Sequence, residues 1–140
     1  MPCEYMIDPT RRLVTSRGTG TFCYRDHLDH VETIGRDPRF QPEFNHLVDC
    51  RGFDHFDLTS AEIQAMSRLT IFAASSRRAL VVASLLHFGL ARIFAALRSR
   101  SHRQETAVFR TLDDAVKWLG LPATYNPGSH AEAMPTTQEA

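Results

Sequence analysis

The sequence predicts an α/β protein with a small, mostly parallel five-stranded sheet, an N-terminal antiparallel hairpin and four helices. The main observation is that short apolar runs alternate along the chain with longer stretches whose apolar residues recur three and four positions apart. Such an alternation of strand and helix is typical of a parallel sheet with right-handed crossovers. With 140 residues and 43% hydrophobic content, the chain is long enough for one ordinary core and too short for two comfortable domains.

The first elements are a hairpin and a helix. Residues 3–7 and 12–17 flank the sequence DPTR, where proline occupies the second position of a β-turn. From Tyr24 onward the apolar residues are spaced three and four apart, and charged residues fill the opposite face. We therefore expect an amphipathic helix that ends near Asp37-Pro38.

The next elements are two strands separated by a helix. Residues 46–50 form a short apolar strand, and residues 79–83 form a continuously apolar one, as expected of a parallel strand covered on both faces. Residues 60–74 between them have the spacing of a helix. Its inward positions are expected to be Ile63, Met66, Leu69 and Ala73.

A third helix, a last strand and a fourth helix complete the expected fold. The apolar stripe of the third helix is predicted to consist of Leu90, Ile93, Phe94 and Leu97. Residues 106–110 follow as a strand and residues 111–119 as a helix. Beyond Leu121 the composition changes to proline, glycine and small polar residues without periodicity. We expect one domain over residues 1–121 and a disordered tail over residues 122–140.

Composition excludes several classes of protein. Sixteen basic and sixteen acidic residues give a formal charge of zero, so we expect no nucleic-acid partner. The cysteines, Cys3, Cys23 and Cys50, are odd in number and lack metal-like or redox-pair spacing, which favours a reducing cytoplasm over a disulfide framework. The most apolar window, residues 79–97, has Arg92 near its middle. A buried strand and helix explain it better than a transmembrane segment.

Four stretches resemble the bacterial SpoIIAA-like family, relatives of the STAS domain of anti-sigma-factor antagonists and sulfate transporters: RRLVTSRGTG, DPRFQPEFNHLVDCRG, FGLARIFAAL and VFRTLDDAVKWLGL. The resemblance covers about residues 4–121 and implies a STAS/SpoIIAA-like sheet with helices packed on it. It also implies a non-enzymatic module, since STAS relatives bind partner proteins and sometimes nucleotides. SpoIIAA-like members are compared with lipid-binding SEC14-type domains. The matching motifs occupy core and cap positions, so they indicate fold more strongly than activity.

The resemblance also directs attention to residues 57–62, DLTSAE. Phospho-switched STAS antagonists carry an acidic-serine-glycine motif at the corresponding place, where the hydroxyl receives phosphate. Matching the acid to Asp57 puts Leu58 where that hydroxyl belongs, and no glycine follows, so the motif is broken. Thr59 and Glu62 instead fit a capping box. Ser60, and after it Thr59, are the candidate phospho-acceptors, because the capping box leaves the Ser60 hydroxyl free.

A ligand site is expected at the carboxyl ends of the parallel strands, where ligands of open α/β sheets bind. Helix N-termini arrive at the same edge and offer N–H groups to an anion. For any single residue, an ordinary loop edge is the alternative. The candidate residues of this strand-end crevice are Asp49, Arg51, Gly52, Ser84, His87, Arg110 and Thr111.

The histidines and Cys50 give no defined metal or catalytic set. His27 and His30 lie three apart on the first helix and could hold a metal only with a third ligand from elsewhere. We expect His27 at the boundary of the apolar stripe, His30 at the surface and His46 in polar surroundings. A neighbouring arginine could lower the pKa of the Cys50 thiol, but the sequence assigns it no base. We therefore predict no catalytic residue, no metal and no cofactor.

Two functions are consistent with these observations, and an enzyme ranks below both. The first is a non-enzymatic STAS-like binding or regulatory module that binds a protein partner in the cytoplasm. The second is a small-molecule or lipid carrier with an apolar pocket under the third helix. A nucleotide is a further possible ligand, which the STAS resemblance implies. That helix carries more apolar residues than one narrow stripe needs, so a pocket, a homodimer interface or a second core layer must cover them. The residues concerned are Leu86, Phe88, Leu90, Ile93, Phe94 and Leu97.

Overall fold

The computed structural model describes residues 3–101 and 104–126, and its main sheet has five strands in the order β1-β2-β4-β6-β7. The strands β1 (Cys3–Asp8) and β2 (Leu13–Gly18) form an antiparallel hairpin. The strands β4 (Asn45–Asp49), β6 (Arg77–Val81) and β7 (Glu105–Phe109) continue the sheet in parallel from β2. The predicted hairpin and mostly parallel sheet are confirmed.

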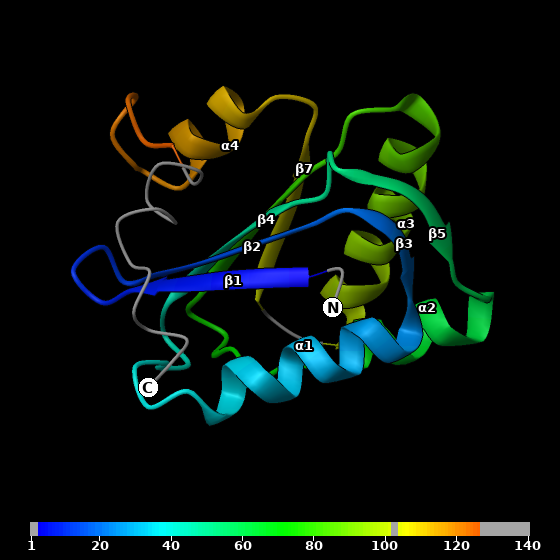
Figure 1. The fold of residues 1–140 in the computed structure, drawn as a ribbon, viewed down its shortest axis with the longest axis horizontal. Helices are drawn as coiled ribbons and strands as arrows, with labels where there is room; N and C mark the ends of the chain where they lie inside the picture. The colour runs from blue at the N-terminus through cyan, green and yellow to red at the C-terminus, as the bar shows by residue number, and fades with distance from the viewer. Residues whose placement is uncertain (1–2, 102–103, 127–140) are drawn as a thin grey trace.

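Helices cover both faces of this sheet (Figure 1). The helices α1 (Tyr24–Arg36), α2 (Ser60–Arg68) and α3 (Leu85–Ser101) lie on one face. The short helix α4 (Leu112–Trp118) lies on the other, where it packs against the central strands. The predicted set of four helices is confirmed within the described chain.

Side chains alternate between the two faces along each central strand. On the α4 face, Leu13, Leu47, Ala79 and Val81 form one buried cluster with residues of α4. On the opposite face, Val14 packs against Ile34 of α1 in a second cluster. The same alternation directs Ser16, His46 and Arg78 to the α1–α3 face, where they line a cavity.

A second, two-stranded parallel sheet was not predicted. It pairs β3 (Gly20–Cys23) with β5 (Phe53–Asp57). Its signal is weak in the sequence, because β5 reads FDHFD and pairs only with a segment about thirty residues away. Gly52, just before β5, lies close to the end of β2, since a Cβ there would collide with the backbone oxygen of Gly18.

Two details of the predicted helices are wrong. The helix expected over residues 60–74 ends at Arg68, and Leu69 is its extended C-cap. The buried Arg98 of α3 donates a 3.1 Å hydrogen bond to the Leu69 carbonyl oxygen, which satisfies this helix end. Ile93, expected in the inward stripe of α3, is 57% exposed. Leu90 and Phe94 of the predicted stripe do face inward, and Ala91 joins them.

The chain packs on the sheet beyond Leu121. Tyr125 belongs to the α4-side cluster, and its hydroxyl lies 2.8 Å from Thr15 Oγ1. The part of the expected tail from residue 127 to 140 lies outside the described residues. No helix of residues 3–101 and 104–126 is long and apolar enough to cross a membrane, and the apolar window 79–97 divides into β6 and α3.

Candidate ligand-binding cavity

A cavity of about 140 Å³ lies between the sheet and the helices α1, α2 and α3. The strands contribute Val48 and Leu80, and α2 contributes Ile63 and Met66. The inward side of α3, for which we expected a cover, contacts the cavity through Leu90, Ala91 and Phe94. Most of the lining is therefore aliphatic or aromatic, as in sites for small apolar molecules.

The unpredicted β3–β5 sheet supplies an aromatic wall. The Phe22 ring centroid lies 5.0 Å from that of Phe53 and 5.9 Å from that of Phe56. His87, at the start of α3, meets the Phe56 ring edge-on at 4.6 Å. These four residues line the cavity, so the small sheet acts as one of its walls.

A second wall carries a chain of polar side chains. Ser16 Oγ lies 2.8 Å from His46 Nε2 and 2.7 Å from His30 Nε2. Because a hydroxyl has one proton, Ser16 donates to one imidazole and accepts from the other. His46 also stacks on Phe72, with ring centroids 4.8 Å apart and planes 16° from parallel. His46 Nδ1 and His27 Nε2 are buried and have no hydrogen-bond partner among the described residues.

Three of the four histidines that line the cavity, His27, His30 and His46, are held neutral. Burial, followed by the positive charge of Arg78, lowers the pKa of His27 to about 3 and that of His30 to about 4. The same two causes lower the pKa of His46 well below its usual value. His30, expected at the surface, and His46, expected in polar surroundings, thus belong to the wall of a mainly apolar cavity.

Arg78 is the cationic side chain most deeply buried in this wall, at 6% exposure. It stands directly opposite His46 on the neighbouring strand, and its guanidinium carbon lies 5.4 Å from the Phe72 ring centroid. Burial lowers its pKa to about 9, so the group remains charged at neutral pH. Reasoning from sequence missed Arg78. The available signal was a charged residue inside the apolar strand RRALVV, which the alternation places on a covered face.

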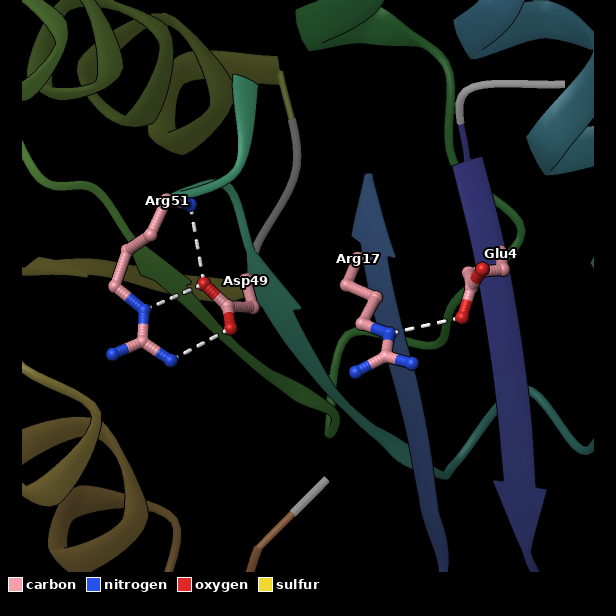
Figure 2. Close-up of polar contacts among 4 residues, drawn as sticks. All are labelled: Glu4, Arg17, Asp49 and Arg51. Carbon is pink, nitrogen blue, oxygen red and sulfur yellow. Dashed lines mark hydrogen bonds and ion pairs between the residues drawn. The ribbon is translucent and has the colours of Figure 1, made fainter. Parts of the chain in front are cut away.

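At the predicted strand-end crevice, the Arg51 side chain is already paired. Arg51 donates to Asp49 from its backbone N–H and from two guanidinium nitrogens, with both side-chain bonds at 2.8 Å (Figure 2). A similar ion pair joins Arg17 and Glu4 on the hairpin at 2.9 Å. The positive charge that we expected to attract an anion is therefore already neutralised at Arg51.

The other predicted crevice residues serve mainly local structure. Ser84 Oγ accepts from the His87 backbone N–H at 3.0 Å, and Thr111 Oγ1 accepts from the Asp114 N–H at 3.2 Å, so both cap helices. Arg110 donates to the Ala83 carbonyl oxygen at 3.1 Å. Gly52 permits the close approach to β2 described above. Of the predicted crevice set, His87 is the residue that also lines the cavity.

The pKa values of two cysteines and the placement of the possible metal ligands do not support a nucleophile or a metal site. Burial and the neighbouring Asp49 raise the pKa of Cys50 to about 12, the opposite of the direction considered from the sequence. Burial likewise raises the pKa of Cys3 to about 11. Within the part of the chain that the structure describes, no group of three His, Cys, Asp or Glu side chains is placed to hold a metal ion.

The capping box at α2 is present as predicted. Glu62 donates from its backbone N–H to Thr59 Oγ1 at 3.1 Å, and its carboxylate accepts from the Thr59 N–H at 2.9 Å. Ser60 follows as an exposed residue in the first turn of the helix. This geometry gives Thr59 a structural role, and the assignment of Ser60 and Thr59 as candidate phospho-acceptors stays a prediction.

No protein-family model matches the chain, and no curated protein matches it. One solved structure that it resembles is an uncharacterized protein of the DUF3478 family with a SpoIIAA-like fold from Shewanella loihica PV-4. The two chains are 18% identical; the match covers 84% of this chain and 93% of the other, with a TM-score of 0.54. At this identity the likeness concerns the fold alone. It confirms the fold that the resemblance implied: the chain has a SpoIIAA-like fold.

Proposed function

We propose that this protein is a non-enzymatic binding module that holds a small, largely apolar ligand in the cavity between the sheet and helices α1–α3. The observation that carries the proposal is the cavity itself, about 140 Å³ in volume and lined mainly by aliphatic and aromatic side chains. An apolar cavity of about 150 Å³ is known to accept benzene, so the space suffices for a small ring or short alkyl group.

The side chains that could act as nucleophiles support a binding role. Burial raises the pKa of Cys50 to about 12, so its thiol is protonated at neutral pH. Ser16 does contact His30 and His46, but burial lowers the pKa of both imidazoles, which makes them weak bases. Within residues 3–101 and 104–126, no carboxylate lines the cavity to orient either ring. We place the protein in the cytoplasm, where its three free cysteines stay reduced.

A substitution that fills the cavity tests this function. Ala91 lines the cavity from α3, whereas Ala96 lies exposed on the same helix. Ala91→Phe should weaken the binding of a neutral probe such as toluene at least about tenfold by calorimetry, because the ring occupies the probe's space. Ala96→Phe should bind the probe like the unmodified protein. Equal affinity in both variants, or no uptake of toluene by the unmodified protein, would contradict the proposal.

A second candidate function is supported by the outer side of α3. Leu85, Leu86 and Ile93 are 72%, 79% and 57% exposed, an uncommon run of large apolar side chains on one helix. Leu86 and Ile93 lie seven residues apart and therefore on the same side of the helix. Such a surface suits a protein partner, as the STAS resemblance implies, and the same helix contacts the cavity from its inner side.

Affinity capture from the source cell with paired variants tests this second candidate. The double variant Leu86→Ser, Ile93→Ser should lose a protein that the unmodified chain retains. The variant Asp113→Ser, at an exposed position on α4, should still retain that protein. Retention of the same proteins by both variants would remove α3 as the docking surface.

A further inference from the structure

The two buried arginines among the described residues differ in their hydrogen bonding. Arg98, with no exposed area, donates to the Leu69 carbonyl oxygen and to Gln104 Oε1, at 3.1 and 2.7 Å. The Nε atoms of both arginines are buried without a partner, but Arg78, at 6% exposure, makes no hydrogen bond or ion pair with a described residue from any guanidinium nitrogen. Arg98 stabilises a helix end. Arg78 has no such structural role.

The surroundings of Arg78 do not neutralise its charge. The register of the sheet places it between His46 on β4 and Thr106 on β7, and both carry a buried polar atom without a hydrogen-bond partner. His27 Nε2, on the α1 wall of the cavity, is a further one. Among the described residues, no Asp or Glu lines the cavity, and three of its four histidines, His27, His30 and His46, are neutral. An isolated buried cation is strongly unfavourable unless an anion accompanies it.

The number of charges and the size of the space narrow the choice of anion. Arg17 also lines the cavity, but it is paired with Glu4 at 2.9 Å, so Arg78 is the guanidinium left to balance one negative charge. Its planar fork matches a carboxylate through two parallel N–H···O bonds. The apolar remainder of the cavity, including Phe56, Met66, Leu90 and Phe94, suits a ring or a short alkyl chain. A cavity of about 140 Å³ leaves room for a body of about the size of benzene.

The geometry points to a small aryl or alkyl monocarboxylate as the ligand class, with its carboxylate on Arg78 and its apolar body against the aromatic wall and α3. This inference rests on the proposed function, because it assigns the chemistry of the ligand to the same cavity. It adds that the protein distinguishes an acid from a neutral molecule of equal shape.

Calorimetric titration with phenylacetate and its neutral isostere phenylacetamide tests the inference near neutral pH, where the acid is ionised. The unmodified protein should bind phenylacetate at least about tenfold more tightly than the amide, since charge-assisted hydrogen bonds distinguish them. Arg78→Met should abolish this preference while still binding the amide. Because it removes an unpaired buried charge, Arg78→Met should also unfold at the same temperature as the unmodified ligand-free protein or higher.

Arg51→Met provides the matched comparison, since Arg51 is paired with Asp49 at the strand-end crevice (Figure 2). Loss of the acid preference in Arg51→Met instead of Arg78→Met would move the anion to that crevice and overturn the inference. Equal binding of acid and amide by the unmodified protein would overturn it too, while leaving the apolar-ligand function in place. Binding of neither molecule, together with no uptake of toluene, would remove the proposed function and the inference together. The comparison of acid and amide needs no variant, so it decides the matter even if Arg78→Met fails to fold.

Discussion

Acidification tests whether the cavity histidines are buried as the structure shows. The pKa of His27 is lowered to about 3 and that of His30 to about 4, from an ordinary value of 6.5. Between these values the unfolded chain binds protons that the folded protein does not. Their contribution to stability is therefore fully present above pH 6.5 and is lost as the pH falls toward the folded pKa values.

The size of the loss follows from the linkage relation. At about pH 5, each of these two histidines has lost about 2 kcal/mol relative to about pH 7, so together they lower the free energy of unfolding by about 4 kcal/mol. His46, whose pKa is also lowered, adds to the loss in the same direction. The Asp37 carboxyl, whose pKa is lowered to about 2, loses its contribution only at more acidic pH. Such a loss is comparable with the whole stability of a small domain.

Urea unfolding at constant ionic strength between about pH 7 and about pH 5 measures this dependence. His27→Leu should reduce the acid-induced loss by about 2 kcal/mol, because one of the buried titrating groups is gone. His55→Gln, on the exposed side of β5 and outside the cavity, should keep the loss of the unmodified protein. A free energy of unfolding that stays constant within about 1 kcal/mol over this range would refute the burial of these histidines.

Three further predictions concern individual positions. Thr59→Ala should lower stability by about 1 kcal/mol through loss of the α2 cap, and Ser60→Ala by less than about 0.5 kcal/mol, both measured by urea unfolding. Mass spectrometry of the protein from its own cells should find neither hydroxyl substantially phosphorylated; stoichiometric phosphate coupled to partner binding would restore the switch. Gly52→Ala should destabilise the protein by about 1–3 kcal/mol, because the new Cβ meets a backbone oxygen of β2. Gly89→Ala, in a helix with open space around the position, should stabilise it by roughly 0.5–1 kcal/mol. Thermal unfolding in which Gly52→Ala stabilises and Gly89→Ala destabilises would contradict the packing. Cys50 should react with a thiol reagent more slowly than an ordinary exposed cysteine, and faster labelling would reopen a catalytic role.

Local patterns determined the strands of the main sheet, the four helices and their order, but not β3 and β5. The spacing from Tyr24 to Ile34, the apolar runs around Leu47 and Leu80, and the Thr59 capping box each depend on neighbours in the sequence, and each appears in the structure as expected. Hydrophobic periodicity and capping are short-range effects that the sequence displays directly. The fold class was predictable for the same reason, since alternating strands and helices leave few arrangements.

Tertiary structure alone decided the site. Ser16, His30 and His46 come from β2, α1 and β4 and meet only because the sheet register and the packing of α1 bring them together. Arg78 and His46 become neighbours through the pairing of β6 with β4. Burial then determines their charge states, and burial is a property of the packed layers that no local pattern contains. Most of the polar residues predicted at the strand ends find partners close by in the chain, as Arg51 does with Asp49, and Arg110 finds the more distant Ala83 carbonyl oxygen. The buried Arg78 finds no partner among the described residues. The sequence therefore determined which layers form, and packing between residues distant in the sequence determined where a ligand can bind.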